Sequence, residues 1–194
     1  SNDTPSIGLA SNGTGNIPPF IAQNTTSVPV VATITVTPTG PAPNFCTGLP
    51  QSFTITVNPH AFIDLTSVVG TNAQTLCIND VLTDITYAVS GGGTGATVSG
   101  LPAGVFGNFS GGVMTISGSP TGPAGVYAYT VTTTGTCAQT SATGTITVSP
   151  NATLTLSSPV GTNAQTLCIN TALFNFGYAV GGTGNNATVA GLPT

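Results

Sequence analysis

The residues of this sequence that could do acid–base or metal chemistry are few and scattered. The chain of 194 residues has one histidine, four aspartates and no lysine, arginine or glutamate. His60 and Asp64 could be two members of a serine–histidine–aspartate set, but no nucleophile elbow accompanies them. Asp80 and Asp84 could share a calcium ion with backbone carbonyls. We therefore predict no enzyme, no cofactor and no dedicated metal site, with Asp80 and Asp84 as the calcium candidates.

A tandem repeat organises the chain. The ten residues GTNAQTLCIN occupy 70–79 and again 161–170, and residues 70–103 align with 161–194 without a gap at an offset of 91. A fixed period of this length suits one small domain per repeat. The sequence predicts the C-terminal part of a repeat at 1–59, a complete repeat at 60–150 and the N-terminal part of the next at 151–194, as in a piece of a longer chain.

The repeat also bears on the candidate sites. At the offset of 91, Asp80 and Asp84 become Thr171 and Asn175. His60 becomes Asn151 in the same alignment. Neither calcium binding nor catalysis is therefore expected to be a property of the repeat.

Composition limits the class of partner. The net charge is −4, with 26 glycines and 15 prolines. Because the chain carries no lysine or arginine, nothing in it attracts phosphate, which argues against nucleic acid and anionic membranes. No apolar run approaches the roughly 20 residues of a membrane span. The recurring short runs of valine, isoleucine, tyrosine and phenylalanine predict a folded chain rather than a disordered one.

Short β-branched and aromatic runs predict an all-β fold. They often alternate at period two, and glycine, proline, asparagine and serine separate them. The predicted strands are 30–37, 52–57, 85–89, 113–117, 126–133 and 144–148, and 75–85 is expected to be strand or turn. Six or seven strands in about 90 residues are typical of an antiparallel β-sandwich of the immunoglobulin kind. Tyr127, Tyr129 and Val131 are predicted to face its core.

The motif residues resemble known bacterial repeats. The run GLPAGVFGNFSGGVMTISGSPTGPAGVYAYTV at 100–131 resembles the immunoglobulin- and cadherin-like repeats of bacterial surface proteins. Residues 74–148 are similar to repeats of very large Bacteroidota adhesins, including gliding-motility adhesins exported by the type IX secretion system, and residues 17–59 to PKD-like repeats of the same proteins. The resemblance implies tandem sandwiches on a cell surface. The sequence departs from it in lacking lysine and arginine, and residues 30–37 match 125–132 only at an offset of 95.

Glycine and proline in this motif predict turns. Proline fixes φ, and glycine permits backbone conformations closed to other residues. Leu101 is expected to be anchored inward where the chain changes direction. A ligand-binding loop is the alternative, but such clusters are mostly turns. The predicted turn residues are Gly100, Leu101, Pro102, Gly104, Gly118 and Pro120.

The four cysteines occupy two repeat positions. Cys77 and Cys137 are 60 residues apart in the complete repeat, a separation typical of immunoglobulin bridges between sheets. Closing such a loop stabilises a fold by roughly 4 kcal/mol. We predict a Cys77–Cys137 bridge, with Cys46 and Cys168 pairing outside the chain given. Zinc ligation is the rival, although no CxxC pair or nearby histidine supports it. Regular cysteines indicate an oxidising, extracellular location.

Two functional classes remain. The first is a semi-rigid stalk of tandem sandwiches joined by short proline-containing linkers, which would serve surface attachment or gliding. The second is a repeat that binds glycan, which the absence of tryptophan disfavours. A variant of the first is a fibre, because the strand edges carry no charges against edge pairing. The expected partners are neighbouring repeats, with surface polysaccharide or like chains in a fibre as alternatives, at the extracellular cell surface.

Overall fold

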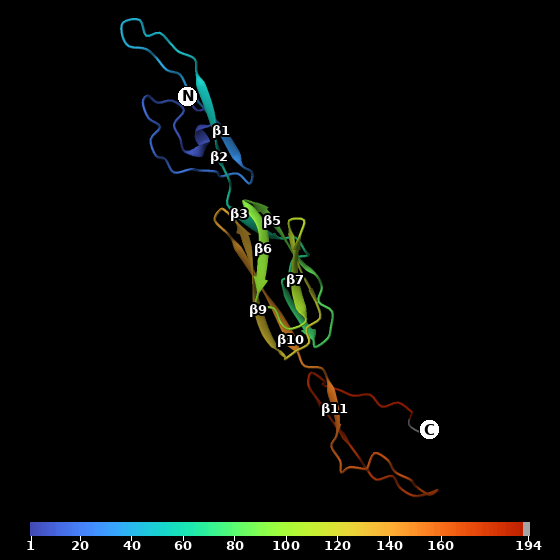
Figure 1. The fold of residues 1–194 in the computed structure, drawn as a ribbon. Helices are drawn as coiled ribbons and strands as arrows, with labels where there is room; N and C mark the ends of the chain where they lie inside the picture. The colour runs from blue at the N-terminus through green and yellow to red at the C-terminus, as the bar shows by residue number, and fades with distance from the viewer. Residues whose placement is uncertain (192–194) are drawn as a thin grey trace.

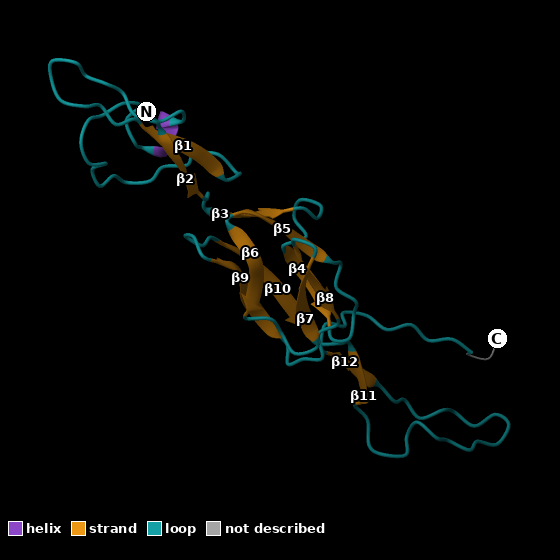
Figure 2. Ribbon diagram, turned by 45° about the horizontal axis from the view of Figure 1, so that its top comes forward, coloured by secondary structure: helices purple, strands orange, loops and turns teal. Residues whose placement is uncertain are grey.

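A computed structural model describes residues 1–191 as three successive bodies, which follow one another along the molecule (Figure 1). We call them the N-terminal unit (1–59), the central unit (60–150) and the C-terminal unit (151–191). Figure 2 shows that the strands concentrate in the central unit, whereas long loops dominate the other two. The described residues contain a single 3-10 helix, η1, and no α-helix. The elements are η1 (Pro5–Ile7), β1 (Val30–Val36), β2 (Gln51–Val57), β3 (Ala61–Leu65), β4 (Ala73–Cys77), β5 (Ile85–Gly91), β6 (Gly93–Ser99), β7 (Val105–Ser110), β8 (Val113–Gly118), β9 (Gly125–Gly135), β10 (Ser141–Ser149), β11 (Thr153–Leu156) and β12 (Tyr178–Gly181).

The central unit is a sandwich of two four-stranded sheets. Their strand orders are β3-β5-β8-β7 and β4-β10-β9-β6. When the strands are lettered along the chain as in immunoglobulin domains, β3, β5, β8 and β7 are strands A, B, E and D of one sheet. β6, β9 and β10 are strands C, F and G of the other sheet, and β4 is added beside G. The predicted fold class is therefore confirmed: the chain is all-β, with an immunoglobulin-like sandwich at its centre.

One strand pair departs from the antiparallel prediction. β4 runs parallel to β10, with Ala73 opposite Thr145 and Cys77 opposite Ser149. After β3, the chain crosses from the first sheet to the second through residues 66–72 and continues in the same direction. Gly70 permits this crossing, because its φ of +94° is one that other residues rarely adopt. The residues 75–85, expected to be strand or turn, form the end of β4, a turn at residues 78–79, an irregular stretch at 80–84 and the first residue of β5.

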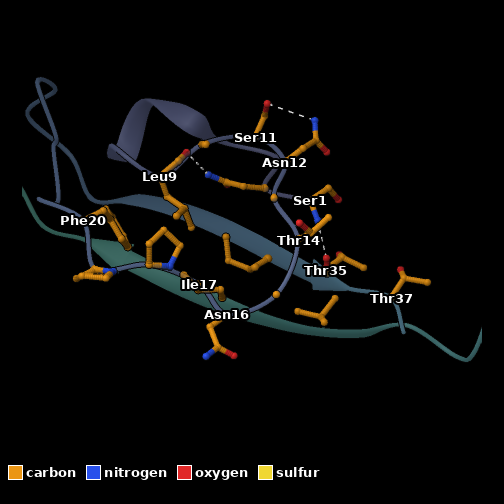
Figure 3. A pocket seen from close by; sticks show the side chains of 18 of the residues that line it. Ser1, Leu9, Ser11, Asn12, Thr14, Asn16, Ile17, Phe20, Thr35 and Thr37 are labelled. Atoms are coloured by element: carbon orange, nitrogen blue, oxygen red, sulfur yellow. Dashed lines mark hydrogen bonds between the residues drawn. The ribbon is translucent and has the colours of Figure 1, made fainter. Parts of the chain in front are cut away.

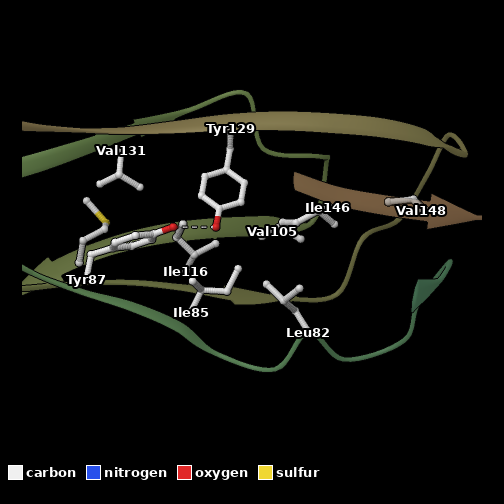
Figure 4. Packing of buried hydrophobic residues seen from close by; sticks show 10 residues of the cluster. Leu82, Ile85, Tyr87, Val105, Ile116, Tyr129, Val131, Ile146 and Val148 are labelled. Atoms are coloured by element: carbon white, nitrogen blue, oxygen red, sulfur yellow. Dashed lines mark hydrogen bonds between the residues drawn. The ribbon is translucent and has the colours of Figure 1, made fainter. Parts of the chain in front are cut away.

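The core of the central unit lies between the two sheets (Figure 4). On β9, Tyr129 and Val131 are buried while Val126 is exposed, as the period-two pattern predicts. Tyr127 is half-buried, and its hydroxyl donates to the Pro123 carbonyl at 2.8 Å. The buried cluster comprises Leu82, Ile85, Tyr87, Val105, Met114, Ile116, Tyr129, Val131, Ile146 and Val148.

The N-terminal unit is built on the β1–β2 hairpin. Residues 1–9 fold back on β1, where Asn2 bridges to Ile34 and the Asp3 carboxylate accepts a bond from the Thr33 N–H at 2.7 Å. Ile7 packs on the hairpin with Ile34 and both are buried. This unit therefore has its own small core, made from a hairpin and the segment that precedes it.

The hairpins of the N-terminal and central units have the same pairing register. In the central unit Tyr129 on β9 lies opposite Gly144 on β10. At the offsets of 95 and 91, these positions become Ile34 and Phe53, which lie opposite each other on β1 and β2. The other pairs of the two ladders match at the same offsets, for example Val30 opposite Val57 and Gly125 opposite Val148. The shared register supports the equivalence of the two hairpins despite the difference in offset.

The C-terminal unit repeats the sequence of the N-terminal part of the central unit but does not have the same structure throughout. β11 pairs with β12, as β3 pairs with β5. The ten residues GTNAQTLCIN nevertheless contain strand β4 in the central unit and no strand at 161–170. β4 pairs with β10, and residues 151–191 include no counterpart of β10 among their strands. The partner strand, rather than the local sequence, decides whether these residues become a strand.

Candidate functional site

The most distinctive polar feature of the core is a tyrosine pair. The Tyr87 and Tyr129 hydroxyls lie 3.0 Å apart and share a hydrogen bond (Figure 4). Their side chains are only 2% and 1% exposed. Because β5 and β9 belong to different sheets, the bond joins the two halves of the sandwich on the B and F strands that carry the bridge of antibody domains. The sequence predicted Tyr129 as a core residue but not its pairing with Tyr87.

The environment of the pair favours neutral hydroxyls. Burial, and then the hydrogen bond to Tyr87, raise the pKa of Tyr129. An unfolded tyrosine ionises near about pH 10, so the folded state holds the proton at a pH where the unfolded state loses it. This contribution to stability is therefore complete below about pH 10 and declines as the pH rises above that value.

Removing one hydroxyl tests the pair. Tyr129→Phe leaves the buried Tyr87 hydroxyl without its partner, so we expect a loss of about 1–3 kcal/mol. Tyr127→Phe is the matched control, since its hydroxyl lies in a partly exposed place and bonds only Pro123. Thermal unfolding followed by near-ultraviolet circular dichroism measures both. Equal losses in the two variants would contradict the assigned role of the pair.

The predicted Cys77–Cys137 bridge is wrong for this structure. Both cysteines are free and half-buried. Cys77 lies opposite Ser149 at the end of β10, whereas Cys137 precedes the start of β10 at Ser141. Eight residues of strand separate these ends, which is roughly 26 Å. The two cysteines, 60 residues apart in sequence, therefore lie at opposite ends of one sheet and not on strands that face each other.

Each cysteine of the central unit instead lies beside a junction. Cys137 is next to the start of the unit: the Ala61 N–H donates to the Ala138 carbonyl at 3.0 Å, and a Cβ at Gly92 would lie 3.1 Å from Cys137 Cβ. Cys77 is at the other end, where Ile78 donates to Ser149 at 3.1 Å. Cys46 and Cys168 are exposed and free, and their pairing outside the chain stays a prediction.

Peptide mapping tests this correction. After alkylation of the 194-residue protein under denaturing, non-reducing conditions, we expect Cys77 and Cys137 to be recovered without a link between them. Chymotrypsin is the suitable protease because the chain has no lysine or arginine. A Cys77–Cys137 peptide from material that keeps its native circular dichroism would contradict the strand order described above.

The two glycine–proline loops, at residues 100–104 and 117–121, are hydrogen-bonded to each other. Gly100, Gly104 and Gly118 have φ of +83°, +85° and +122°, and Pro102 and Pro120 are buried. The Ser119 N–H donates to Gly104 O at 3.1 Å and the Thr121 N–H to Ala103 O at 2.9 Å. The SGSP loop at residues 117–120 also accepts a hydrogen bond from the segment after β4, since the Leu82 N–H donates to the Gly118 carbonyl at 2.9 Å. Leu101 packs against the core. The arrangement has the geometry of structural turns.

The ionisable candidates do not gather into a site. His60 and Asp64 lie four residues apart on extended chain, roughly 13 Å, too far for a hydrogen bond. The Asp80 carboxylate accepts from the Cys77 N–H at 3.1 Å and so caps the turn after β4; Asp84 is exposed. Within residues 1–191 no three histidine, cysteine, aspartate or glutamate side chains lie close enough to hold a metal ion.

A hollow lies in the N-terminal unit (Figure 3). It is a groove of about 1150 Å³ between the loop of residues 8–20 and the end of β1. Ser1 donates from its amino group to the Thr35 carbonyl at 2.6 Å across one side. Phe20 is the one aromatic residue of the lining. Sugar-stacking platforms of tyrosine or tryptophan are therefore missing from this groove.

Comparisons with known proteins give two distant structural neighbours. No family model and no curated protein matches the chain. Titin domain M7 is 14% identical, with 47% of this chain and 96% of that chain covered and a TM-score of 0.38. A chimeric titin Z1Z2 carrying an exogenous decorin peptide is 17% identical, with coverage of 46% and 95% and a TM-score of 0.35. The fold assignment rests on the strand order alone. In the described part of the chain no helix has the length and apolar character to cross a membrane.

Proposed function

We propose that this chain is a structural repeat region of an extracellular bacterial adhesin or filament, acting as a semi-rigid, non-catalytic stalk. The observation that carries the proposal is the shortness of the junctions. β2 ends at Val57 and β3 begins at Ala61; β10 ends at Ser149 and β11 begins at Thr153. Linkers of three residues leave neighbouring units little freedom to bend.

The first junction is also held on the side of the central unit. Pro59 is fully buried, the Gly92 N–H donates to the His60 carbonyl at 2.9 Å, and the Thr140 hydroxyl donates to the Ala61 carbonyl at 3.0 Å. These contacts fix the direction in which the chain enters the unit. Successive units joined in this way form a rod. The function of such a rod is to span a distance, and it needs no binding pocket.

The proposed location follows from the resemblance of residues 17–59 and 74–148 to adhesin repeats. The chain also offers no cleavage site to trypsin-like proteases, because it has no lysine or arginine, which suits an exposed stalk. The partners are then the neighbouring repeats, with an adhesive surface elsewhere along the molecule.

Electron microscopy of cells of the source organism tests the proposal. Immunogold label raised against the central unit is expected on threads one domain wide that project from the cell surface. Antibody preabsorbed with the 194-residue protein is the control. Label confined to the cell interior would overturn the extracellular role, and label on compact particles would overturn the stalk.

A further inference from the structure

The two cysteines of the central unit lie at opposite ends of it. Cys77 is the last residue of β4 and lies opposite Ser149, the last residue of β10, at the junction with the following unit. Cys137 lies in the loop between β9 and β10, at the junction with the preceding unit. Both thiols are free, and the length of β10 keeps them from reaching each other. Each cysteine is therefore positioned to meet a cysteine of a neighbouring unit.

The N-terminal unit shows the same polarity for the loop cysteine. Cys46, the counterpart of Cys137, lies in the loop between β1 and β2. Val36 and Gln51 pair at this end of the hairpin, whereas Val57 lies at the other end, from which the chain enters the central unit. Figure 1 shows this loop at the end of the N-terminal unit that is remote from the central unit. The loop cysteine thus lies at the start of the unit in both cases.

The second junction is built like the first. A Cβ at Gly93 would lie 3.3 Å from Ala61 Cβ in the central unit. At the offset of 91, a Cβ at Gly184 would lie 3.1 Å from Ala152 Cβ in the C-terminal unit. The chain therefore enters the two units in the same way, and the contacts of one junction can be transferred to the other.

This transfer places the counterpart of Cys137 beside Pro150. At the first junction a Cβ on Gly92 would lie 3.1 Å from Cys137 Cβ and would overlap the Pro59 carbonyl. The counterpart of Gly92 is Thr183, and its hydroxyl donates to the Pro150 carbonyl at 2.9 Å. Thr183 thus marks the place at the second junction that a loop cysteine of the following unit adjoins.

Cys77 approaches the same linker from the central unit. It lies opposite Ser149, roughly 4.8 Å away in the direction of the interstrand hydrogen bonds, and Pro150 follows Ser149 directly. We propose that Cys77 forms a disulfide with the counterpart of Cys137 in the following unit, so that each junction carries one bridge. Both cysteines then adjoin one dipeptide, as a bridge between Cα atoms roughly 4.4–6.8 Å apart requires. The inference rests on the proposed function, because it takes the units to follow one another in a longer array.

Bridge formation needs an oxidant of the disulfide class. The two cysteine thiols lose two protons and two electrons and form one S–S bond, and the oxidant, such as glutathione disulfide, is reduced to two thiols. The bridge ties a strand end of one unit to a loop of the next across a linker of three residues. It therefore restricts both bending and rotation at the junction.

A cysteine introduced at the second junction tests the geometry in the 194-residue protein. The background keeps Cys77 and has serine at the other three cysteine positions. Thr183→Cys then puts a thiol where the hydroxyl contacts Pro150. After oxidation by glutathione disulfide in dilute protein, we expect an internal link to Cys77, detected by chymotryptic mapping. A Cys77 thiol that stays unlinked in protein with native circular dichroism would overturn the proposal.

Thr162→Cys in the same background is the matched control. The Thr162 hydroxyl also donates to a proline carbonyl, that of Pro159, at 2.8 Å. It lies beyond the end of β11, away from the junction, so we expect no link to Cys77. Equal linking in the two variants would mean that proximity at the junction is not the cause, and would contradict the assigned geometry.

A longer variant tests the native pair. A copy of residues 104–150 added after Thr194 supplies the counterparts of β7–β10 and a second copy of Cys137 in the following unit. With the original Cys137 replaced by serine, we expect the copy to link to Cys77 under the same oxidation. A link from the copy to Cys168, the other cysteine of its own unit, would overturn the bridge between units.

Mapping of the native protein separates this inference from the proposed function. Non-reduced material from the source organism should yield Cys77 linked to a peptide other than that of Cys137. Threads on the cell surface with a free Cys77 thiol would overturn the bridge and leave the stalk. Bridged protein located inside the cell would support the bridge and overturn the extracellular role.

Discussion

Replacing Leu82 by alanine is expected to lower the melting temperature of the central unit by roughly 10 °C or more. Leu82 is 2% exposed and belongs to the core cluster with Ile85 and Ile116. Removing a buried leucine side chain leaves a cavity and costs about 2–5 kcal/mol. In a domain of this size each kcal/mol shifts the midpoint by about 4–8 °C.

The chain contains its own control for this experiment. Leu173 is the repeat equivalent of Leu82 and is 60% exposed, so Leu173→Ala should change the stability of the monomer by no more than about 0.5 kcal/mol. Calorimetry at a concentration where the protein is monomeric measures both variants. If the two substitutions had equal effects, the central unit would not be the one closed sandwich of the three.

The period-two runs were sufficient to predict four of the eight strands of the central unit, β5, β8, β9 and β10, but not β3, β6 or β7. All six predicted strand ranges fall on observed strands, and the burial of Tyr129 and Val131 confirms the predicted core face. These predictions succeed because alternation records which face of a strand is buried. The glycine-rich β6 carries no such alternation, and its strand state depends on the ladder with β9.

The two copies of GTNAQTLCIN mark the limit of local sequence. Identical residues pair as a strand at Ala73–Cys77 and do not at 164–168. A strand at a sheet edge gains its hydrogen bonds from a neighbour that is distant in sequence. No window of ten residues contains that information, so only the presence of a β10-like partner decides the outcome.

The cysteine prediction failed for a related reason. A separation of 60 residues fits a bridge between the B and F strands, but it equally fits the end of an added edge strand and the loop between F and G. The useful signal was the position of the cysteines within the predicted strands. Tyr87 and Tyr129 lie inside hydrophobic runs, whereas Cys137 lies beyond the run that ends at Thr133. The inter-sheet contact on B and F is accordingly made by tyrosines.

Introducing a single methyl group at Gly144 is expected to disrupt the same core from the opposite side. A Cβ at Gly144 would overlap the Tyr129 hydroxyl, its ring carbon Cζ and the Asn72 carbonyl. Tyr129 has little room to move, because it is 1% exposed and its hydroxyl is bonded to Tyr87. Overpacking of this kind costs about 1–3 kcal/mol and occasionally more, so Gly144→Ala should lower the melting temperature by roughly 5–20 °C.

Gly125→Ala is the matched control, since a Cβ there meets Tyr127 at an ordinary 3.7 Å and should change stability little. At the equivalent positions of the N-terminal unit, Ile34 lies opposite Phe53, so a side chain other than tyrosine is compatible with this strand pair. If volume is the cause, Gly144→Ala should cost less in a Tyr129→Ile background than in the wild type, a coupling that a double-mutant cycle measures. Additive losses would mean that the Asn72 carbonyl, and not the tyrosine ring, excludes the side chain.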